Sequence, residues 1–146
     1  MKRIVIATDG SAESTVAVAE GIELAQGIDA AVTFVSVRPA IPFLGSPYYE
    51  QKLRERLAEA RAAVDEAMAV AAGSGVEADY EILEGDPAEE ILRLAHSRDA
   101  DLVVVGSRGL GAVGRALLGS VSSAVVHGAD RPVLVTKARA AAASHA

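Results

Sequence analysis

The sequence contains no cysteine and no tryptophan, and aromatic residues make up 3% of its 146 residues. Without cysteine, disulfides and thiolate metal sites are excluded. No window approaches about 18 apolar residues without a charge, so no membrane-spanning helix is predicted. The opening MKRIVIATDG has an apolar run too short for a signal peptide. We therefore expect one globular domain in the cytoplasm.

Acidic residues are missing from one long window of an otherwise acidic chain. The net charge is −6, and nucleic-acid-binding proteins usually carry a basic footprint, so nucleic acid is a poor partner. Residues 102–129 include no Asp or Glu, whereas Arg108, Arg115 and His127 lie within them. A small anion would find its most favourable local potential in this window.

Short β-branched runs alternate with helical patterns along the whole chain. Ser11 and Asp86 are the predicted N-caps of the first and third helices, with Pro87 in the first helical position. In the second helix, Leu53 and Leu57 begin an apolar stripe. The predicted strands cover residues 3–8, 30–37, 76–83, 101–105 and 131–137, and the predicted helices cover 11–27, 50–72, 86–98 and 119–129.

This alternation predicts an α/β domain in which a parallel sheet carries helices on both faces. Ligands of such open sheets bind beyond the carboxyl ends of the strands. Two loops of unusual composition follow predicted strands. One is TDGS after the first strand, and the other is GSRGLGAVGRALLGS, residues 106–120, after DLVVV.

The glycine-rich stretch does not match two familiar phosphate sites. Gly109, Gly111 and Gly114 form G-x-G-x-x-G, but a dinucleotide fingerprint follows the first strand, and here a single strand remains. A Walker P-loop requires Gly-Lys-Ser/Thr, and the chain has no lysine between Lys52 and Lys137.

Another arrangement of glycines suits a phosphate better. Gly106 directly follows the strand, where a residue without Cβ lets a ligand approach the backbone. Gly119 and Ser120 open the next helix, whose first amides and positive dipole end attract anions. Ser120 and Ser122 add hydroxyl groups. The alternative is a glycine-rich loop with a serine cap that binds nothing.

The pattern Gly-x-x-Gly, nine residues, Gly-Ser and then PVLV resembles the universal stress protein family. IVIATDGSAES and GDPAEEIL are also similar to segments of that family. The resemblance covers residues 1–137, which we predict to be the domain, and residues 138–146 are predicted to be a disordered tail. It implies an open five-stranded parallel sheet, Rossmann-like and of the adenine nucleotide alpha hydrolase-like type. It also implies a homodimer paired through the last strand, from Arg131 to Lys137.

The resemblance further implies ATP binding, because members with this glycine motif bind ATP. It does not separate ATP from ADP, AMP or a cyclic nucleotide. Arg115, in the middle of the loop, is either a phosphate ligand or a solvated side chain. Asp9 is also a candidate contact for Mg²⁺ bound with ATP. The ligand residues that the resemblance implies are Ala7, Thr8, Asp9, Val37, Val105, Gly106, Arg108, Gly109, Gly119, Ser120, Val121 and Ser122.

Three functions stay open at this point: an ATP-dependent regulatory module of the stress response, a slow ATPase, and a nucleotide-free dimeric scaffold. Hydrolysis needs a positioned base or a metal-bound water, and no general base is evident beside Asp9. We therefore expect slow or negligible turnover. His96, His127 and His145 lack metal-ligand spacing, so no histidine metal site is predicted.

Overall fold

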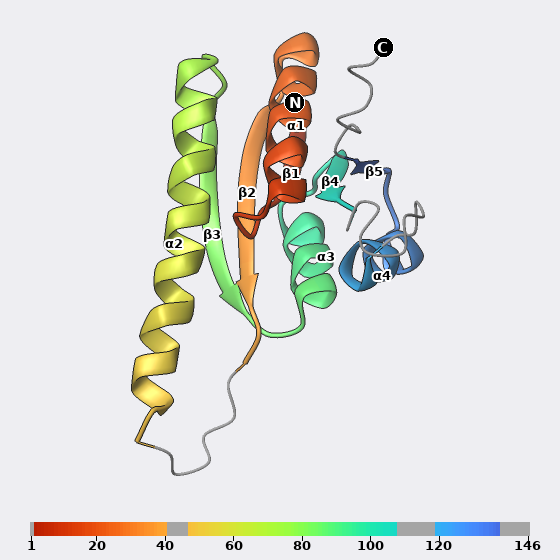
Figure 1. Ribbon diagram of the computed structural model, residues 1–146. Helices are drawn as coiled ribbons and strands as arrows, with labels where there is room; N and C mark the ends of the chain where they lie inside the picture. The colour runs from red at the N-terminus through yellow and green to blue at the C-terminus, as the bar shows by residue number, and fades with distance from the viewer. Residues whose placement is uncertain (1, 41–46, 108–118, 138–146) are drawn as a thin grey trace, which may run out of the picture.

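Five parallel strands form a single sheet in the order β3-β2-β1-β4-β5 in a computed structural model of the chain (Figure 1). The structure describes residues 2–40, 47–107 and 119–137. The strands are β1 (Arg3–Ala7), β2 (Ala31–Arg38), β3 (Ala78–Glu84), β4 (Leu102–Gly106) and β5 (Val133–Thr136). The helices are α1 (Ala12–Ile28), α2 (Tyr49–Gly73), α3 (Pro87–Ser97) and α4 (Ser120–Gly128). The predicted α/β class and the alternation of strands and helices are confirmed.

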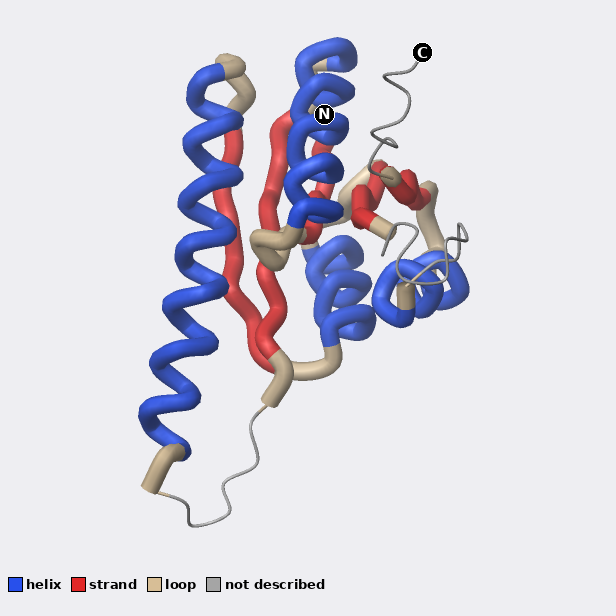
Figure 2. The backbone as a smooth tube through the Cα atoms, in the orientation of Figure 1, coloured by secondary structure: helices blue, strands red, loops and turns tan. Residues whose placement is uncertain are grey.

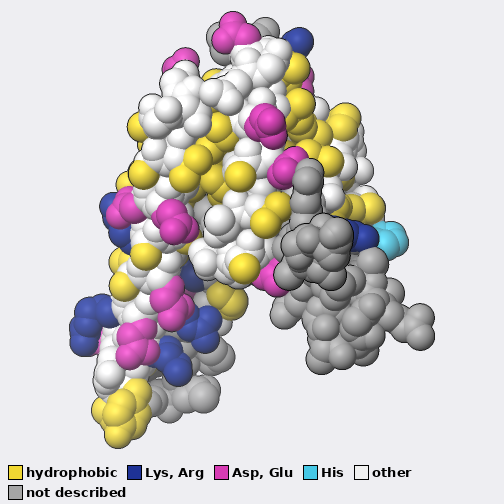
Figure 3. All heavy atoms as spheres, turned by 45° about the horizontal axis from the view of Figure 1, so that its top comes forward, with side chains coloured by type: hydrophobic (Ala, Val, Ile, Leu, Met, Phe, Trp, Pro, Cys, Tyr) yellow, Lys and Arg dark blue, Asp and Glu magenta, His cyan; other side chains and the backbone are white. Residues whose placement is uncertain are grey.

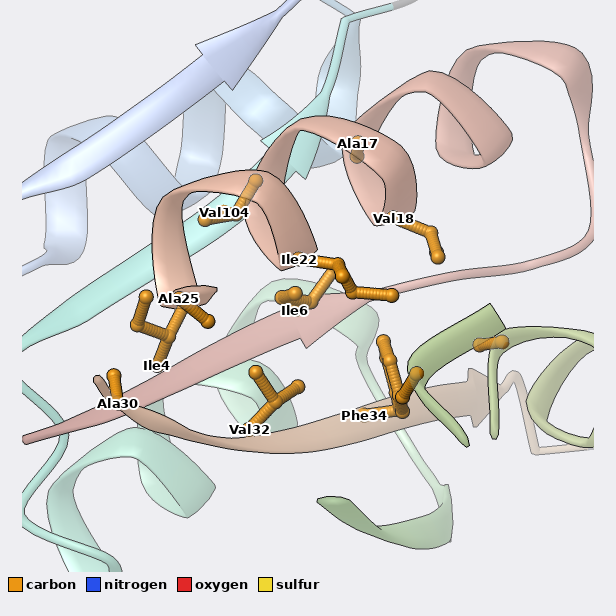
Figure 4. Packing of buried hydrophobic residues seen from close by; sticks show 12 residues of the cluster. Ile4, Ile6, Ala17, Val18, Ile22, Ala25, Ala30, Val32, Phe34 and Val104 are labelled. Carbon is orange, nitrogen blue, oxygen red and sulfur yellow. The ribbon is translucent and has the colours of Figure 1, made fainter. Parts of the chain in front are cut away.

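Helices cover both faces of the sheet because alternate strand residues point to opposite sides. On one face, α1 and α2 pack on β1, β2 and β4, as Figure 4 shows for the α1 side. That core includes Ile4, Ile6, Val32, Phe34 and Val104. On the other face, α3 and α4 cover a core that includes Val5, Val35, Val103, Ile91 and Val125. Figure 2 shows the helices flanking the strands.

Two helices begin where their capping residues predict. The Ser14 N–H donates to the Ser11 hydroxyl oxygen at 3.2 Å at the start of α1. The Glu89 N–H donates to a carboxylate oxygen of Asp86 at 3.0 Å at the start of α3. Each side chain satisfies an amide that the first turn of a helix leaves without an intrahelical partner.

The first turns of α2 extend past the carboxyl ends of β2 and β3 (Figure 1). The prediction that Leu57 belongs to the buried stripe is therefore wrong, because the sheet does not reach it and 41% of its surface is exposed. Burial begins one turn later, at Ala60. Side chains of both charges cover this extension, at the lower left of Figure 3.

Polar groups at the amino ends of the strands pair with one another. Arg98, which follows α3, bonds Glu81 at 2.7 Å and Asp79 at 3.0 Å. The buried Thr33 hydroxyl donates to Asp79 at 2.7 Å. Partial burial acts to raise the pKa of Asp79, but hydrogen bonds from Thr33 and Arg98 and the charges of Arg98 and Arg3 lower it overall. The polar side chains at this end of the sheet thus pair with one another.

No helix in the described ranges has both the length and the apolar character that crossing a bilayer requires. The cytoplasmic location stays a prediction. Residues 138–146, the predicted tail, lie outside the described residues.

Candidate functional site

A cleft of about 470 Å³ lies at the carboxyl ends of β1, β2 and β4. Its volume falls in the range of about 300–1,000 Å³ that is typical of small-molecule sites. Of the thirteen residues predicted to bind a ligand, Arg108, Gly109 and Arg115 lie outside the described residues. The other ten all line the cleft: Ala7, Thr8, Asp9, Val37, Val105, Gly106, Gly119, Ser120, Val121 and Ser122.

The β1–α1 turn forms one wall of the cleft and is held by a chain of hydrogen bonds. The Thr8 N–H donates to the Val35 carbonyl at 2.9 Å, which holds the turn to β2. The Thr8 and Ser14 hydroxyl oxygens lie 3.2 Å apart. The Asp9 N–H donates to the Ser14 hydroxyl at 3.3 Å. The turn is therefore rigidly connected to both β2 and α1.

The carboxylate of Asp9 takes part in the same turn. Its Oδ1 atom accepts a hydrogen bond from the Ser11 N–H at 2.9 Å. Partial burial acts to raise the pKa of Asp9, but hydrogen bonds from Ser11 and Ser14 outweigh it and leave the pKa below the ordinary aspartate value. Gly10 has a φ of 83°, a conformation that suits glycine. Asp9 is thus held ionised at the mouth of the cleft.

The first turn of α4 forms the opposite wall. Gly119 is the N-cap residue, in an extended conformation, and makes no side-chain capping hydrogen bond. The buried Ser122 hydroxyl donates to the Gly119 carbonyl at 3.2 Å, so it braces the turn from within. Ser120 is exposed, and the first turn has no acidic residue. A helix start of this kind offers amides and a positive dipole end to an anion.

Gly106 brings β4 close to the first turn of α1. A Cβ added at Gly106 would lie 2.6 Å from the Glu13 carbonyl oxygen, closer than real Cβ atoms approach. The sequence pattern suggests that this glycine serves the approach of a ligand, and the structure supplies a second reason in the packing of α1. The residue therefore sets how closely β4 approaches the first turn of α1.

Apolar side chains cover the floor of the cleft on the side of α3 and α4. Val105 is buried, while Ala7, Val37 and Val121 are partly buried against the same core. Ile91 of α3 also lines the cleft. Apolar lining with a few polar groups at the rim is the usual composition of sites that hold a flat organic ring.

Sequence reasoning missed two arginines that line the cleft, Arg38 and Arg56. Arg38 ends β2, one residue after the predicted Val37. Arg56 precedes the buried Ala60 by four residues and so lies on the same side of α2. The helical spacing places Arg56 on the same side of α2 as Ala60, and this could have been read from the sequence. That Arg56 faces a cleft depends on where α2 extends past the sheet, which the sequence does not show.

No three His, Cys, Asp or Glu side chains among the described residues are grouped so that they could hold a metal ion. A Mg²⁺ ion that is bound through nucleotide phosphates needs one or two protein carboxylates. Asp9 therefore stays the predicted contact for such an ion.

Comparisons with known proteins show the family and the fold of the chain. The model of the universal stress protein family matches residues 1–137. A universal stress protein of Thermus aquaticus is 42% identical over 138 residues, which are 93% of this chain and 98% of the relative. A family member from Burkholderia pseudomallei has a solved structure with a TM-score of 0.79 and 27% identity, covering 94% of this chain and 96% of that one. A universal stress protein solved in complex with cAMP has a TM-score of 0.74 and 26% identity, covering 94% and 98%.

Proposed function

This chain belongs to the universal stress protein family, and from that premise we propose that it binds an adenine nucleotide, with ATP as the expected ligand. The observation that carries the proposal is the first turn of α4, which lines the cleft and has no side-chain cap among the described residues. The relative solved with cAMP supports an adenine nucleotide as the class of ligand.

The two walls of the cleft divide the ligand between them in this proposal. Phosphate oxygens accept hydrogen bonds from the amides at Ser120 to Ser122. The start of a helix favours a negatively charged phosphate over a neutral group. The base and ribose lie over the apolar floor near Val37, beside the β1–α1 turn. Asp9 is the residue that would hold a Mg²⁺ ion bound with the nucleotide, and the ion would offset the charge of the phosphates. Arg108, Gly109 and Arg115 are predicted to complete the phosphate site from the loop.

The proposed role is that of a regulatory module of the stress response. Asp9 accepts a hydrogen bond from the turn itself, so its carboxylate is held as a structural group and is poorly disposed to act as a general base. This supports slow or negligible hydrolysis. Occupancy of the cleft, rather than turnover, would then be what a partner protein detects.

We also propose a homodimer that pairs through β5. This strand lies at an edge of the sheet, where backbone groups stay available to another chain. Leu134 in its middle is 37% exposed, which gives the edge an apolar side chain to bury. Light scattering of the purified chain tests this, and Leu134→Lys should shift a dimer toward the monomer. A monomeric wild type would contradict the dimer and leave the nucleotide proposal intact.

A thermal-shift series on nucleotide-stripped protein tests the binding proposal, with Mg-ATP, AMP, GTP and NADH compared at equal concentration. A ligand present at about 100 times its Kd adds about 2.7 kcal/mol of stability. For a domain of this size that is a rise in Tm of several degrees. We expect a rise with ATP, a smaller rise with GTP, and none with ATP in Gly119→Val. No rise with any nucleotide would favour the dimeric scaffold instead.

A further inference from the structure

Arg38 lies at the β2 end of the cleft, and two of its nitrogen atoms have no hydrogen-bond acceptor among the described residues. Its side chain is 19% exposed. Its Nε and Nη1 atoms are buried and make no hydrogen bond to any described residue. The Nη1 atom lies 3.9 Å from Oε2 of Glu84, its register partner on β3, a distance too long for a hydrogen bond.

Buried guanidinium nitrogens that lack a hydrogen-bond acceptor are costly to the folded protein. Arginine carries donors and no acceptor, and a buried charged donor that lacks a partner loses more free energy than a neutral one. Because Arg38 lines the cleft, a ligand bound there lies beside its guanidinium. The ligand then supplies an acceptor that no described residue supplies.

Arg56 reaches the same end of the cleft from α2. It lies four residues before Ala60, on the inward side of the helix, and it lines the cleft. Within the described ranges it makes no ion pair and no hydrogen bond. Arg54, two residues earlier, is exposed and does not line the cleft. The contrast identifies Arg56 as a second cation directed to the ligand and Arg54 as its matched control.

The sheet determines which part of a nucleotide meets these arginines. Adjacent strands lie about 4.8 Å apart, and β1 lies between β2 and β4. The end of β2 is therefore about 10 Å from the end of β4, where the amides of α4 would hold phosphate. A mononucleotide spans a similar distance from phosphate to base. The neighbouring carboxylates of Glu84 and Glu59 also disfavour a second phosphate group at this end.

On the basis of the proposed function, we propose that Arg38 is the residue by which this chain recognises the base. Its guanidinium donates a hydrogen bond to a ring-nitrogen acceptor of the purine, and Arg56 adds a second cationic contact from α2. The nucleotide is thus held at two points, by its phosphate on α4 and by its base on β2.

Calorimetric titration with AMP and with ribose 5-phosphate separates the two points, because the second ligand lacks the base. Arg38→Met should weaken AMP binding at least about tenfold, the ratio that corresponds to about 1.4 kcal/mol, and change ribose 5-phosphate binding by less than about twofold. Arg56→Met should act in the same direction with a smaller loss. Arg54→Met should leave both ligands unchanged.

Two further variants separate recognition from structure. Arg38→Lys keeps the charge but lacks the Nε donor and the planar fork, so it should lose AMP affinity even if Arg38→Met folds poorly. Glu84→Gln removes the 3.9 Å ion pair and should leave AMP affinity unchanged.

The titrations distinguish failure of this proposal from failure of the proposed function. Unchanged AMP affinity in both Arg38 variants would overturn this proposal and leave the proposed function standing. An equal loss for AMP and ribose 5-phosphate would also overturn it, because Arg38 would then act on phosphate or on the shape of the cleft. A wild type that binds neither ligand would overturn the proposed function, and this proposal with it.

Discussion

The first turns of α1 and α4 border the same cleft, yet they differ in how their backbone amides are capped. In α1, the Ser11 side chain accepts a hydrogen bond from the Ser14 N–H, and Glu13 adds a negative charge to the first turn. In α4, Gly119 makes no side-chain capping bond and the first turn carries no acid. Among the described residues, a side chain caps the start of α1, and none caps the start of α4.

The difference shows that a helix start near a cleft is not by itself an anion site. Both helices direct the positive ends of their dipoles toward the cleft. In α1, Asp9 and Glu13 oppose that potential and Ser11 occupies an amide. We therefore expect the phosphate to bind at α4, while the turn before α1 supports the rest of the nucleotide.

Giving α4 the kind of cap that α1 has should abolish the difference. In Gly119→Asp, the new carboxylate can accept from the first-turn amides and repel phosphate, and the extended backbone at this position (φ −71°) accepts any residue. We expect ATP and AMP affinity to fall at least about 100-fold, or about 2.7 kcal/mol. Calorimetry measures the loss.

Gly119→Ala is the control for this variant, because it adds a Cβ without an acceptor. It should lose far less affinity than Gly119→Asp, while the Tm of both variants stays near that of the wild type. Wild-type affinity in Gly119→Asp would mean that the phosphate binds elsewhere.

The next largest effect should come from Gly106, which sets the distance between β4 and the first turn of α1. A side chain there meets the Glu13 carbonyl oxygen at 2.6 Å, and forcing extra atoms into a packed site costs about 1–3 kcal/mol. Gly106→Ala should therefore lower the free energy of unfolding by that amount in urea titrations. Gly75 is no fair control, because its φ is positive, whereas Gly73→Ala meets no atom within 4 Å and should cost little.

Removing the α1 cap should affect stability rather than binding. Ser11→Ala loses the bond to the Ser14 N–H, and loss of an N-cap side chain costs about 1 kcal/mol. Urea unfolding should show this loss while phosphate affinity changes little. A loss of affinity as large as that of Gly119→Asp would mean that the two helix starts share the phosphate.

The smallest effect concerns pH and the turn before α1. The pKa of Asp9 in the folded chain lies below its ordinary value of 3.8, so its ionised form stabilises the fold above that value and this contribution is lost as the pH falls through the folded pKa. The difference in unfolding free energy between wild type and Asp9→Asn should be constant near neutral pH and shrink below about pH 4. A difference in unfolding free energy that grows as the pH falls would contradict a lowered pKa of Asp9.

The sequence predicted those features that depend on neighbouring residues. Ser11 and Asp86 predict where their helices begin, because a capping side chain and the amide it accepts from lie three residues apart. The alternation of strands and helices predicts the parallel sheet. The ten described residues that were predicted to bind the ligand line one cleft because parallel strands share a carboxyl edge. Arg38 and Arg56 could not be assigned to the cleft from local sequence. The register of β2 and the direction of α2 determine that both side chains line it.

An NMR titration tests most directly whether the phosphate binds at α4, since it reports on both helix starts in one experiment. AMP is added to the nucleotide-stripped, isotope-labelled wild type, and the amide signals of residues 120–122 are compared with those of residues 12–14. We expect large saturable shifts in the first turn of α4 and smaller ones in the first turn of α1. Shifts confined to α1, or no shifts at either turn, would contradict phosphate binding at α4.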